Sequence, residues 1–379
     1  MRPGLVTRNR VLLLIPHLGI GGAQRVTATL ARHLDSVKYE VHLALITQSP
    51  TSFTVPAPEF PASVRIHCLG AKRARYAAFR LIALVRELRP HLVFVGMAHL
   101  APLVPLLRAL LPAKTHIILR QNGSFFSTRT ALRPRVLSRM TLAIAYRGTD
   151  VIICQTQSTA AELHRELHLD HAQLCVLPNP VDIQGIRQAC SDASQGHETS
   201  HSCLLAVGRH VPEKGFDLLL DAFGAVRRDF PTLRLRIAGS GSCQTALQSQ
   251  ARRLGVEDRI EFLGDVRSPS QYFPDALAFV LSSREDELPN ALLEAAAAGL
   301  PIIATPASPG IADLLVDHPG VWLARNASAS ALEKALRDAV TCIRHRERFT
   351  HGWVDPFALA PALAAYERLF DRVLNGQGA

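Results

Sequence analysis

Several features that mark common protein classes are missing from this sequence of 379 residues. No apolar run approaches the roughly 20 residues of a membrane-spanning helix. The apolar stretch at residues 11–15 is too short for the core of a secretory signal, and Pro16 interrupts it. We therefore expect a cytoplasmic protein with neither an export signal nor a membrane span.

Thiol and metal motifs are missing as well. The seven cysteines include no C-x-x-C pair, and their odd number fits free thiols in a reducing compartment. His164 and His168 lie four residues apart, but arginine follows His164 where a zinc protease needs glutamate. That spacing predicts a solvated helix face rather than a metal site. A P-loop and a G-x-S-x-G nucleophile motif are also absent.

Acidic residues are scarce in the first half of the chain. Residues 1–185 contain 22 Lys and Arg against 9 Asp and Glu, a net +13, and the remainder contains 20 against 23, a net −3. From Arg65 to Arg147 there are 15 basic residues and one acid, Glu87. This asymmetry indicates either an anionic partner or a solvated basic surface. Nucleic acid is disfavoured, because the basic segment lacks interleaved aromatic residues and any zinc-finger or helix-turn-helix pattern.

What is present is an alternation of short apolar runs with amphipathic segments, the pattern of β-α units on a parallel sheet. The expected strands are 11–15, 41–46, 92–95, 115–119, 150–154, 173–177, 203–207, 233–238, 259–262, 277–281 and 301–304. The expected helices are near 22–34, 76–88, 99–111, 131–146, 157–167, 290–299 and 356–374. The predicted fold class is α/β, with two Rossmann-like domains whose facing sheets share a central cleft.

The polar segment 188–202 is the best candidate for a linker, because strand alternation restarts directly after it. The chain length suits two domains rather than one. We expect a first domain at 1–187, a second at 203–355, and a final helical stretch at 356–379 with no strand after it.

A glycine loop follows the first expected strand and includes Gly21 and Gly22. Glycine lets the backbone approach a ligand, and the helix that follows presents free N–H groups to an anion. The G-x-G-x-x-G dinucleotide pattern would need glycine at Gln24, and no acidic residue ends the strand at 41–46. A nicotinamide-dependent dehydrogenase is therefore disfavoured.

Two cations lie on the loop after strand 203–207, in the run Gly208-Arg209-His-Val-Pro-Glu-Lys214-Gly215. The guanidinium of Arg209 can form a bidentate contact with phosphate oxygens, and Lys214 supplies a point charge. Together they suit a pyrophosphate.

An acidic loop, residues 283–287, leads into a helix that we expect Asn290 to cap. The free N–H groups of residues 290–292 would face whatever that loop holds. Glu294 lies in the first turns of this alanine-rich helix and needs a polar partner, because unpaired burial is costly. A ribose diol is such a partner.

These motifs, with Asn179-Pro-Val-Asp182, Gly239-Ser-Gly241, Phe262-Leu-Gly264 and the run 289–301, resemble family 4 of the retaining glycosyltransferases, the glycosyl transferases group 1. The resemblance implies the GT-B fold, with an acceptor domain, a donor domain and a last helix that crosses back to the first domain. It implies transfer of a hexosyl group from a nucleotide-diphosphate sugar, UDP-linked, to a glycan or lipid-linked acceptor, in polysaccharide or glycolipid synthesis and without a cofactor.

The resemblance also implies catalytic roles. Arg209 and Lys214 would bind the donor diphosphate, and Glu294 would hold the ribose. The first acid of the family's Glu-x7-Glu motif is Asp286 here, one methylene shorter. Glu285 and Glu287 flank it, so the register of this acid is open.

Further positions follow from the same resemblance. The donor-binding residues would be Gly21, Gly22, Val266, Asn290, Ala291 and Leu292. His99 and Asn122 are candidates on the acceptor side, after the strands at 92–95 and 115–119. The chain has no D-x-D motif of the metal-dependent glycosyltransferases, so no metal is predicted.

The basic run predicts peripheral, salt-sensitive docking of the first domain on an anionic membrane surface, the inner face of the cytoplasmic membrane. One cluster lies within residues 72–86, and the other comprises Arg129, Arg133, Arg135 and Arg139. An acidic acceptor in solution would explain the same charge. Two other functions stay open, a sugar-nucleotide epimerase of the same fold and a non-catalytic binding protein.

Overall fold

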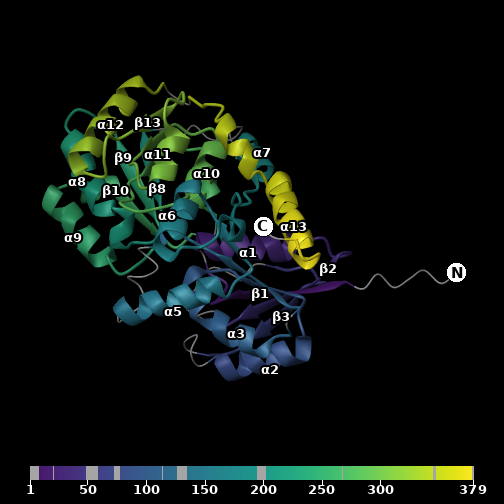
Figure 1. Ribbon diagram of the computed structural model, residues 1–379. Helices are drawn as coiled ribbons and strands as arrows, with labels where there is room; N and C mark the ends of the chain where they lie inside the picture. Colours follow the sequence, from purple (N-terminus) through teal and green to yellow (C-terminus); the bar gives the residue numbers. More distant parts are fainter. Residues whose placement is uncertain are drawn as a thin grey trace. The chain divides into compact units, whose positions relative to one another are not determined.

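The computed structural model (Figure 1) describes residues 8–19, 21–47, 59–71, 77–112, 114–125, 135–193, 202–266, 268–344 and 347–377. The chain divides into two compact units. Unit 1 comprises Met1–Pro180 with Ala360–Ala379, and unit 2 comprises Val181–Leu359. In the part of the chain that these ranges cover, no helix is both long and apolar enough to cross a bilayer.

Unit 1 alternates strands and helices along the chain. Its strands are β1 (Asn9–Ile15), β2 (Tyr39–Leu45), β3 (Arg65–Cys68), β4 (Leu92–Val95), β5 (His116–Arg120), β6 (Val151–Cys154) and β7 (Leu174–Val176). Its helices are α1 (Gly22–His33), α2 (Ala78–Leu88), α3 (Val104–Leu110), α5 (Arg135–Arg147), α6 (Gln157–Leu167) and α13 (Leu359–Leu374), with short 3-10 segments η2 (Ala98–Leu103) and η3 (His171–Gln173).

Among the described residues, the strands of unit 1 form a seven-stranded parallel sheet in the order β3-β2-β1-β4-β5-β6-β7. β1 is central, and its residues alternate between two apolar clusters. Leu12 and Leu14 pack with α2, α3, α5 and α6, whereas Val11, Leu13 and Ile15 pack with α1 and α13. Helices therefore cover both faces of the sheet, which explains why its strands read as continuous apolar runs.

Unit 2 repeats the plan. Its strands are β8 (Cys203–Val207), β9 (Arg234–Ala238), β10 (Ile260–Gly264), β11 (Ala276–Leu281), β12 (Ile302–Ala304) and β13 (Val321–Leu323). Its helices are α7 (Ile183–Ala193), α8 (Phe216–Val226), α9 (Gln244–Leu254), α10 (Asn290–Ala297), α11 (Pro309–Leu315) and α12 (Ala329–Cys342). Its 3-10 segments are η4 (Pro212–Lys214), η5 (Glu257–Arg259), η6 (Pro269–Tyr272) and η7 (Gly352–Phe357).

The described strands of unit 2 form a six-stranded parallel sheet in the order β10-β9-β8-β11-β12-β13. In both sheets the direction of strand addition reverses once, between β1 and β4 in unit 1 and between β8 and β11 in unit 2. Loops that leave neighbouring strands at such a reversal diverge, and ligands of open α/β sheets bind there, beyond the carboxyl ends of the strands. The topology thus singles out the carboxyl ends of β1 and β4 in unit 1 and of β8 and β11 in unit 2.

The unit boundary differs from the expected linker. The first part of 188–202 is helical, because α7 extends to Ala193. Ile183 is buried against the apolar core of unit 2, with Ile186 and Cys190 packed beside it. The helix therefore belongs to the second unit, and the chain divides after Pro180.

The final helix returns to unit 1. On α13, four buried side chains face the core that contains Val11, Leu13 and Ile15: they are Tyr366, Leu369, Phe370 and Val373. The segment expected as one helix at 99–111 is instead η2 followed by α3, with Pro102 inside the 3-10 turn. Proline has no backbone N–H to donate within a regular helix, which accounts for the break.

Candidate active site

The loop that carries Arg209 and Lys214 leaves β8 at the reversal point of unit 2. Gly215 ends it with φ 61°, and a Cβ there would lie 2.1 Å from the carbonyl oxygen of Ser282. Only glycine fits this left-handed position. Gly239, after β9, has φ 125°, and a Cβ there would lie 2.0 Å from the carbonyl oxygen of Gly208. Two of the motif glycines therefore hold the phosphate-binding candidate loop against its neighbours.

Lys214 and Asp286 are in contact beyond the carboxyl ends of β8 and β11. The Nζ of Lys214 forms an ion pair with Oδ2 of Asp286, and the side chains are only 19% and 16% exposed. The Oγ of Ser283 donates to the same carboxylate oxygen at 3.3 Å. The structure thus brings two predicted catalytic residues together from the ends of β8 and β11. Arg209, on the same loop as Lys214, is exposed.

The acidic loop itself is held by an arginine. The guanidinium of Arg284 donates to both carboxylate oxygens of Asp217, at 2.7 and 2.5 Å, and to the carbonyl of Pro212 at 2.9 Å. The backbone N–H of Arg284 donates to the carbonyl of Glu213 at 2.7 Å. Hydrogen bonding to Arg284 is the main reason why the pKa of Asp217 is lowered. These bonds fix the loop beside η4 and so position Asp286.

The three acids of this loop have different environments. Glu285 is exposed, Asp286 is half-buried against Lys214, and Glu287 is buried. The carbonyl oxygen of Glu287 accepts a hydrogen bond from the Oγ of Ser308 at 3.4 Å. Asp286 is thus in direct contact with a predicted catalytic cation, Lys214.

The expected cap of α10 is wrong by one residue. Pro289 occupies the N-cap position, and Asn290 is the first helical residue. The N–H of Leu292 donates to the carbonyl of Pro289 at 3.0 Å, so this amide is not free, although it was expected to be. Glu294 lies one turn further along and is half-buried, as is Val266 after β10.

His210 is a residue of this loop that the sequence did not single out. Its ring is fully buried and makes edge-on contacts with Phe216 and Phe262, at centroid distances of 5.4 and 6.0 Å. Neither ring nitrogen has a hydrogen-bond partner among the described residues. Burial lowers the pKa of His210, and the charge of Asp265 offsets part of the effect. The buried ring of His210 therefore packs the loop between Arg209 and Lys214 against Phe216 and Phe262.

Beyond the carboxyl ends of β1, β4 and β5 in unit 1 lie two donor-binding candidates, Gly21 and Gly22, and two acceptor-side candidates, His99 and Asn122. Gly21 is the N-cap of α1 and Gly22 its first residue. The N–H of Ala98 donates to Oδ1 of Asn122 at 3.1 Å, which ties the segment of His99 to the end of β5. Desolvation lowers the pKa of His99, and the nearby imidazole of His17 lowers it further. His17, after β1, was not predicted because it is a lone histidine outside any motif.

A pocket of about 550 Å³ lies elsewhere in unit 2, at the amino ends of its strands. It is lined by Cys203, Arg234, Leu235, Arg236, Arg259, Ile260, Glu261 and Asp275. Lys214 follows the carboxyl ends, so this pocket is separate from the predicted site. Within the described ranges, no group of three or more His, Cys, Asp or Glu residues could hold a metal ion.

Two parallel α/β units, each with candidate residues beyond the carboxyl ends of its strands, define a protein of the GT-B fold. Sucrose-phosphate synthase from Thermosynechococcus elongatus has a similar structure, with a TM-score of 0.79 and 16% identity over 98% of this chain and 100% of that one. HepE of Anabaena in complex with UDP-glucose gives a TM-score of 0.71 and 15% identity over 96% and 99%. These likenesses concern the fold.

Sequence comparison places the chain in a family. Residues 20–184 match Glycosyltransferase Family 4, and residues 191–352 match Glycosyl transferases group 1. The chain belongs to these glycosyltransferases. A Campylobacter jejuni relative is 24% identical over 318 residues, which cover 80% of this chain and 83% of its own. That relative is named N-acetylgalactosamine-N,N'-diacetylbacillosaminyl-diphospho-undecaprenol 4-alpha-N-acetylgalactosaminyltransferase.

Proposed function

We propose that this glycosyltransferase moves a hexosyl group from a UDP-sugar to a lipid-linked or glycan acceptor, with retention of configuration and without a metal ion. The observation that carries the proposal is the contact between Lys214 and Asp286 at the reversal point of unit 2, with Arg209 on the same loop. A similar fold with bound UDP-glucose supports the donor, and the C. jejuni relative, named for a diphospho-undecaprenol substrate, supports the acceptor.

The proposed chemistry breaks the bond between the sugar C1 and the β-phosphate oxygen. Negative charge then develops on the departing UDP, and preorganised cations stabilise it best. Arg209 and Lys214 supply that charge, and the N-terminus of α10 adds the favourable end of a helix dipole. The acceptor hydroxyl forms the new bond on the same face of the sugar, and its proton passes to the departing phosphate. Glu294 binds the ribose hydroxyls.

The donor and the metal requirement are tested together. Purified protein in EDTA, given polyprenyl-diphosphate-linked acceptors, is expected to release UDP from a UDP-hexose and to leave GDP-mannose intact. NMR of the product is expected to show the donor's anomeric configuration. The reason is that protein cations, rather than a metal, neutralise the leaving group.

Each alternative has its own outcome in that assay. Loss of transfer in EDTA that Mg²⁺ or Mn²⁺ restores contradicts the metal-free mechanism. Conversion of the donor into another sugar nucleotide without acceptor identifies an epimerase. Nucleotide binding without turnover identifies a non-catalytic protein.

The proposal includes peripheral docking of unit 1 on an anionic membrane. Residues 72–76 and 126–134 of the two basic clusters, and the side chains of Arg135 and Arg139, lie outside the described part of the structure. Nearby, Met140 and Ile144 are 63% and 58% exposed, one turn apart on α5, and Phe79 on α2 is 84% exposed. Exposed apolar side chains close to a basic cluster are typical of interfacial helices.

Co-sedimentation with phosphatidylglycerol vesicles tests this docking. Binding is expected at low salt and should disappear at high salt, because each basic residue contributes on the order of 1 kcal/mol at an anionic surface. Arg135→Gln with Arg139→Gln is expected to weaken binding several-fold, whereas Arg252→Gln with Arg253→Gln, on exposed α9, should not. Absence of binding at low salt would exclude membrane docking and favour an acidic acceptor in solution.

A further inference from the structure

Arg120, the last residue of β5, is a fully buried arginine that lacks a full set of partners. Its Nη2 donates to Oδ1 of Asn179 at 2.6 Å. Nε and Nη1 have no hydrogen-bond acceptor among the described residues, and no ion pair within those residues includes Arg120. A buried charge without a counter-charge costs free energy. Such a residue is therefore a poor structural element and a candidate for another role.

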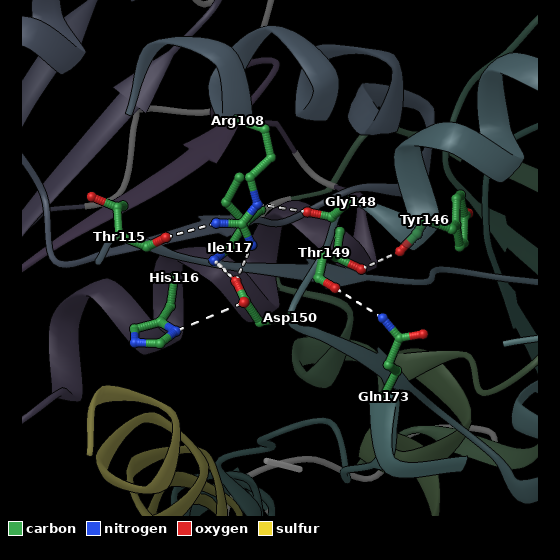
Figure 2. A network of polar contacts seen from close by, with 9 residues as sticks. All are labelled: Arg108, Thr115, His116, Ile117, Tyr146, Gly148, Thr149, Asp150 and Gln173. Atoms are coloured by element: carbon green, nitrogen blue, oxygen red, sulfur yellow. Dashed lines mark hydrogen bonds and ion pairs between the residues drawn. The ribbon is translucent and has the colours of Figure 1, made fainter. Parts of the chain in front are cut away.

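Arg108, on α3, is a half-buried arginine of the same unit whose partners lie just before β5 and β6 (Figure 2). Its Nε donates to the carbonyl of Gly148 at 2.9 Å, its Nη1 donates to the carbonyl of Thr115 at 2.8 Å, and its Nη2 forms an ion pair with Asp150. Each of its guanidinium nitrogens has an acceptor. Arg108 is thus the structural counterpart with which Arg120 can be compared.

The groups around Arg120 flank both places where the chain passes between the units. Asn179 immediately precedes Pro180, the last residue before the first passage. Tyr366 lies on α13, the first helix after the chain returns at Ala360. Its hydroxyl is buried, and although burial raises the pKa of Tyr366, the charge of Arg120 offsets part of that rise.

The segment that enters unit 2 at Val181 and the segment that leaves it before Ala360 are hydrogen-bonded to each other. The N–H of Val181 donates to the carbonyl of Phe357 at 2.9 Å, and Val181 forms a parallel β-bridge with Ala358. In unit 1, Arg120 lies between Asn179, which precedes the first passage, and α13, which follows the second. Arg120 therefore interacts with Asn179, just before the first passage, and with Tyr366, on the helix that follows the second.

Arg120 also begins the loop with the acceptor-side candidates. The side chain of Gln121 is buried and accepts a hydrogen bond from the hydroxyl of Tyr146. Asn122 holds the backbone of Ala98, next to His99. A shift of Arg120 would move this loop, because β5 passes directly into it.

We infer that Arg120 is a positioning residue that couples the two chain passages to the acceptor-side loop of unit 1. Because its charge is only partly paired, it can exchange partners at low cost when Asn179 or α13 moves. Its effect on catalysis rests on the proposed function, whereas its anchoring of the two passages does not.

Arg120→Met tests the inference, with Arg108→Met as the matched control. Arg120→Met is expected to lower kcat about 10-fold or more, because small misplacements of reacting groups have large effects. KM for UDP-glucose should stay within about 2-fold, since most of the donor candidates lie in unit 2. The melting temperature should not fall, because an apolar side chain replaces a poorly paired buried charge. Arg108→Met should do the reverse, lowering the melting temperature and leaving kcat unchanged.

Hydrogen exchange supplies a readout that is independent of turnover. In Arg120→Met, backbone exchange is expected to rise at residues 177–183 and 357–366, and in Tyr366→Phe at the second segment only. Wild-type exchange and kcat in Arg120→Met would overturn the inference. If Arg120→Met does not fold, Arg120→Lys and Tyr366→Phe decide by the same two readouts. If the wild type transfers no sugar, the proposed function fails, but the exchange comparison still decides the role of Arg120.

Discussion

Replacement of Lys214 by alanine is expected to reduce kcat by about 100-fold or more, the range seen when one preorganised donor to a developing anion is removed. The ammonium of Lys214 lies beside Asp286 at the reversal point of the unit 2 sheet, where it can meet the β-phosphate of the donor. Charge on that phosphate increases as the glycosidic bond breaks, so the lost contact is strongest in the transition state. Arg209→Ala should act in the same direction.

Lys38→Ala is the matched control for this experiment. Lys38 also forms an ion pair, with Asp371 at 3.6 Å, but on the exposed surface of unit 1. Exposed pairs contribute little to stability, so this variant should keep wild-type kcat and melting temperature. Steady-state kinetics and thermal unfolding of the three variants give the comparison. Wild-type kcat in both Lys214→Ala and Arg209→Ala would remove the diphosphate site from the mechanism.

The elements that the sequence predicted well are those whose burial is two-sided. β4 is buried throughout and β1 is buried from Val11 to Ile15, and both read there as unbroken apolar runs. β3 was missed because it is an exposed edge strand, in which Arg65, Ile66 and Cys68 are all exposed. β13, which was also missed, is three residues long and half-buried throughout. A strand that is buried on both faces has a continuous apolar sequence, whereas an exposed edge strand does not.

The linker was misassigned for a related reason. Polar residues predominate from Gln188 onward, and polarity alone suggested a structureless segment. The helix α7 nevertheless has a narrow apolar stripe, in which Ile183, Ile186 and Cys190 share one face. A stripe of three residues is sufficient to bury one side of a short helix against a neighbouring core. The spacing of the apolar residues, rather than the polar composition, indicated that this segment is a helix.

The sequence predicted the loops of the candidate site one by one, but it did not predict which of their residues are in contact. Arg209 and Lys214 were identified by their place after a strand, and Asp286 by its spacing from Glu294. Their meeting depends on β8 and β11 being neighbours, and the strand order is not written in any local motif. His17 and His210 were missed because each is a single residue without a spacing pattern. Their relevance emerges only from the contacts around them.

The register of the acidic loop can be decided by three single alanine variants. Asp286→Ala is expected to lower kcat about 100-fold, because it removes the carboxylate that pairs with Lys214, the cation proposed to bind the donor phosphate. Glu285→Ala should be close to wild type, since its side chain is exposed. Glu287→Ala should mainly lower the melting temperature, because Glu287 is buried.

Asp286→Glu completes the comparison by restoring the residue typical of the family. It is expected to keep more activity than Asp286→Ala, because the longer carboxylate can still reach Lys214. The decisive measurement is kcat at unchanged folded fraction, checked by thermal unfolding of each variant. If Glu287→Ala abolishes turnover while its melting temperature is unchanged, the acid acts from position 287 and the loop must shift by one residue on donor binding. In that case the Lys214–Asp286 pair would be a resting contact that the donor replaces.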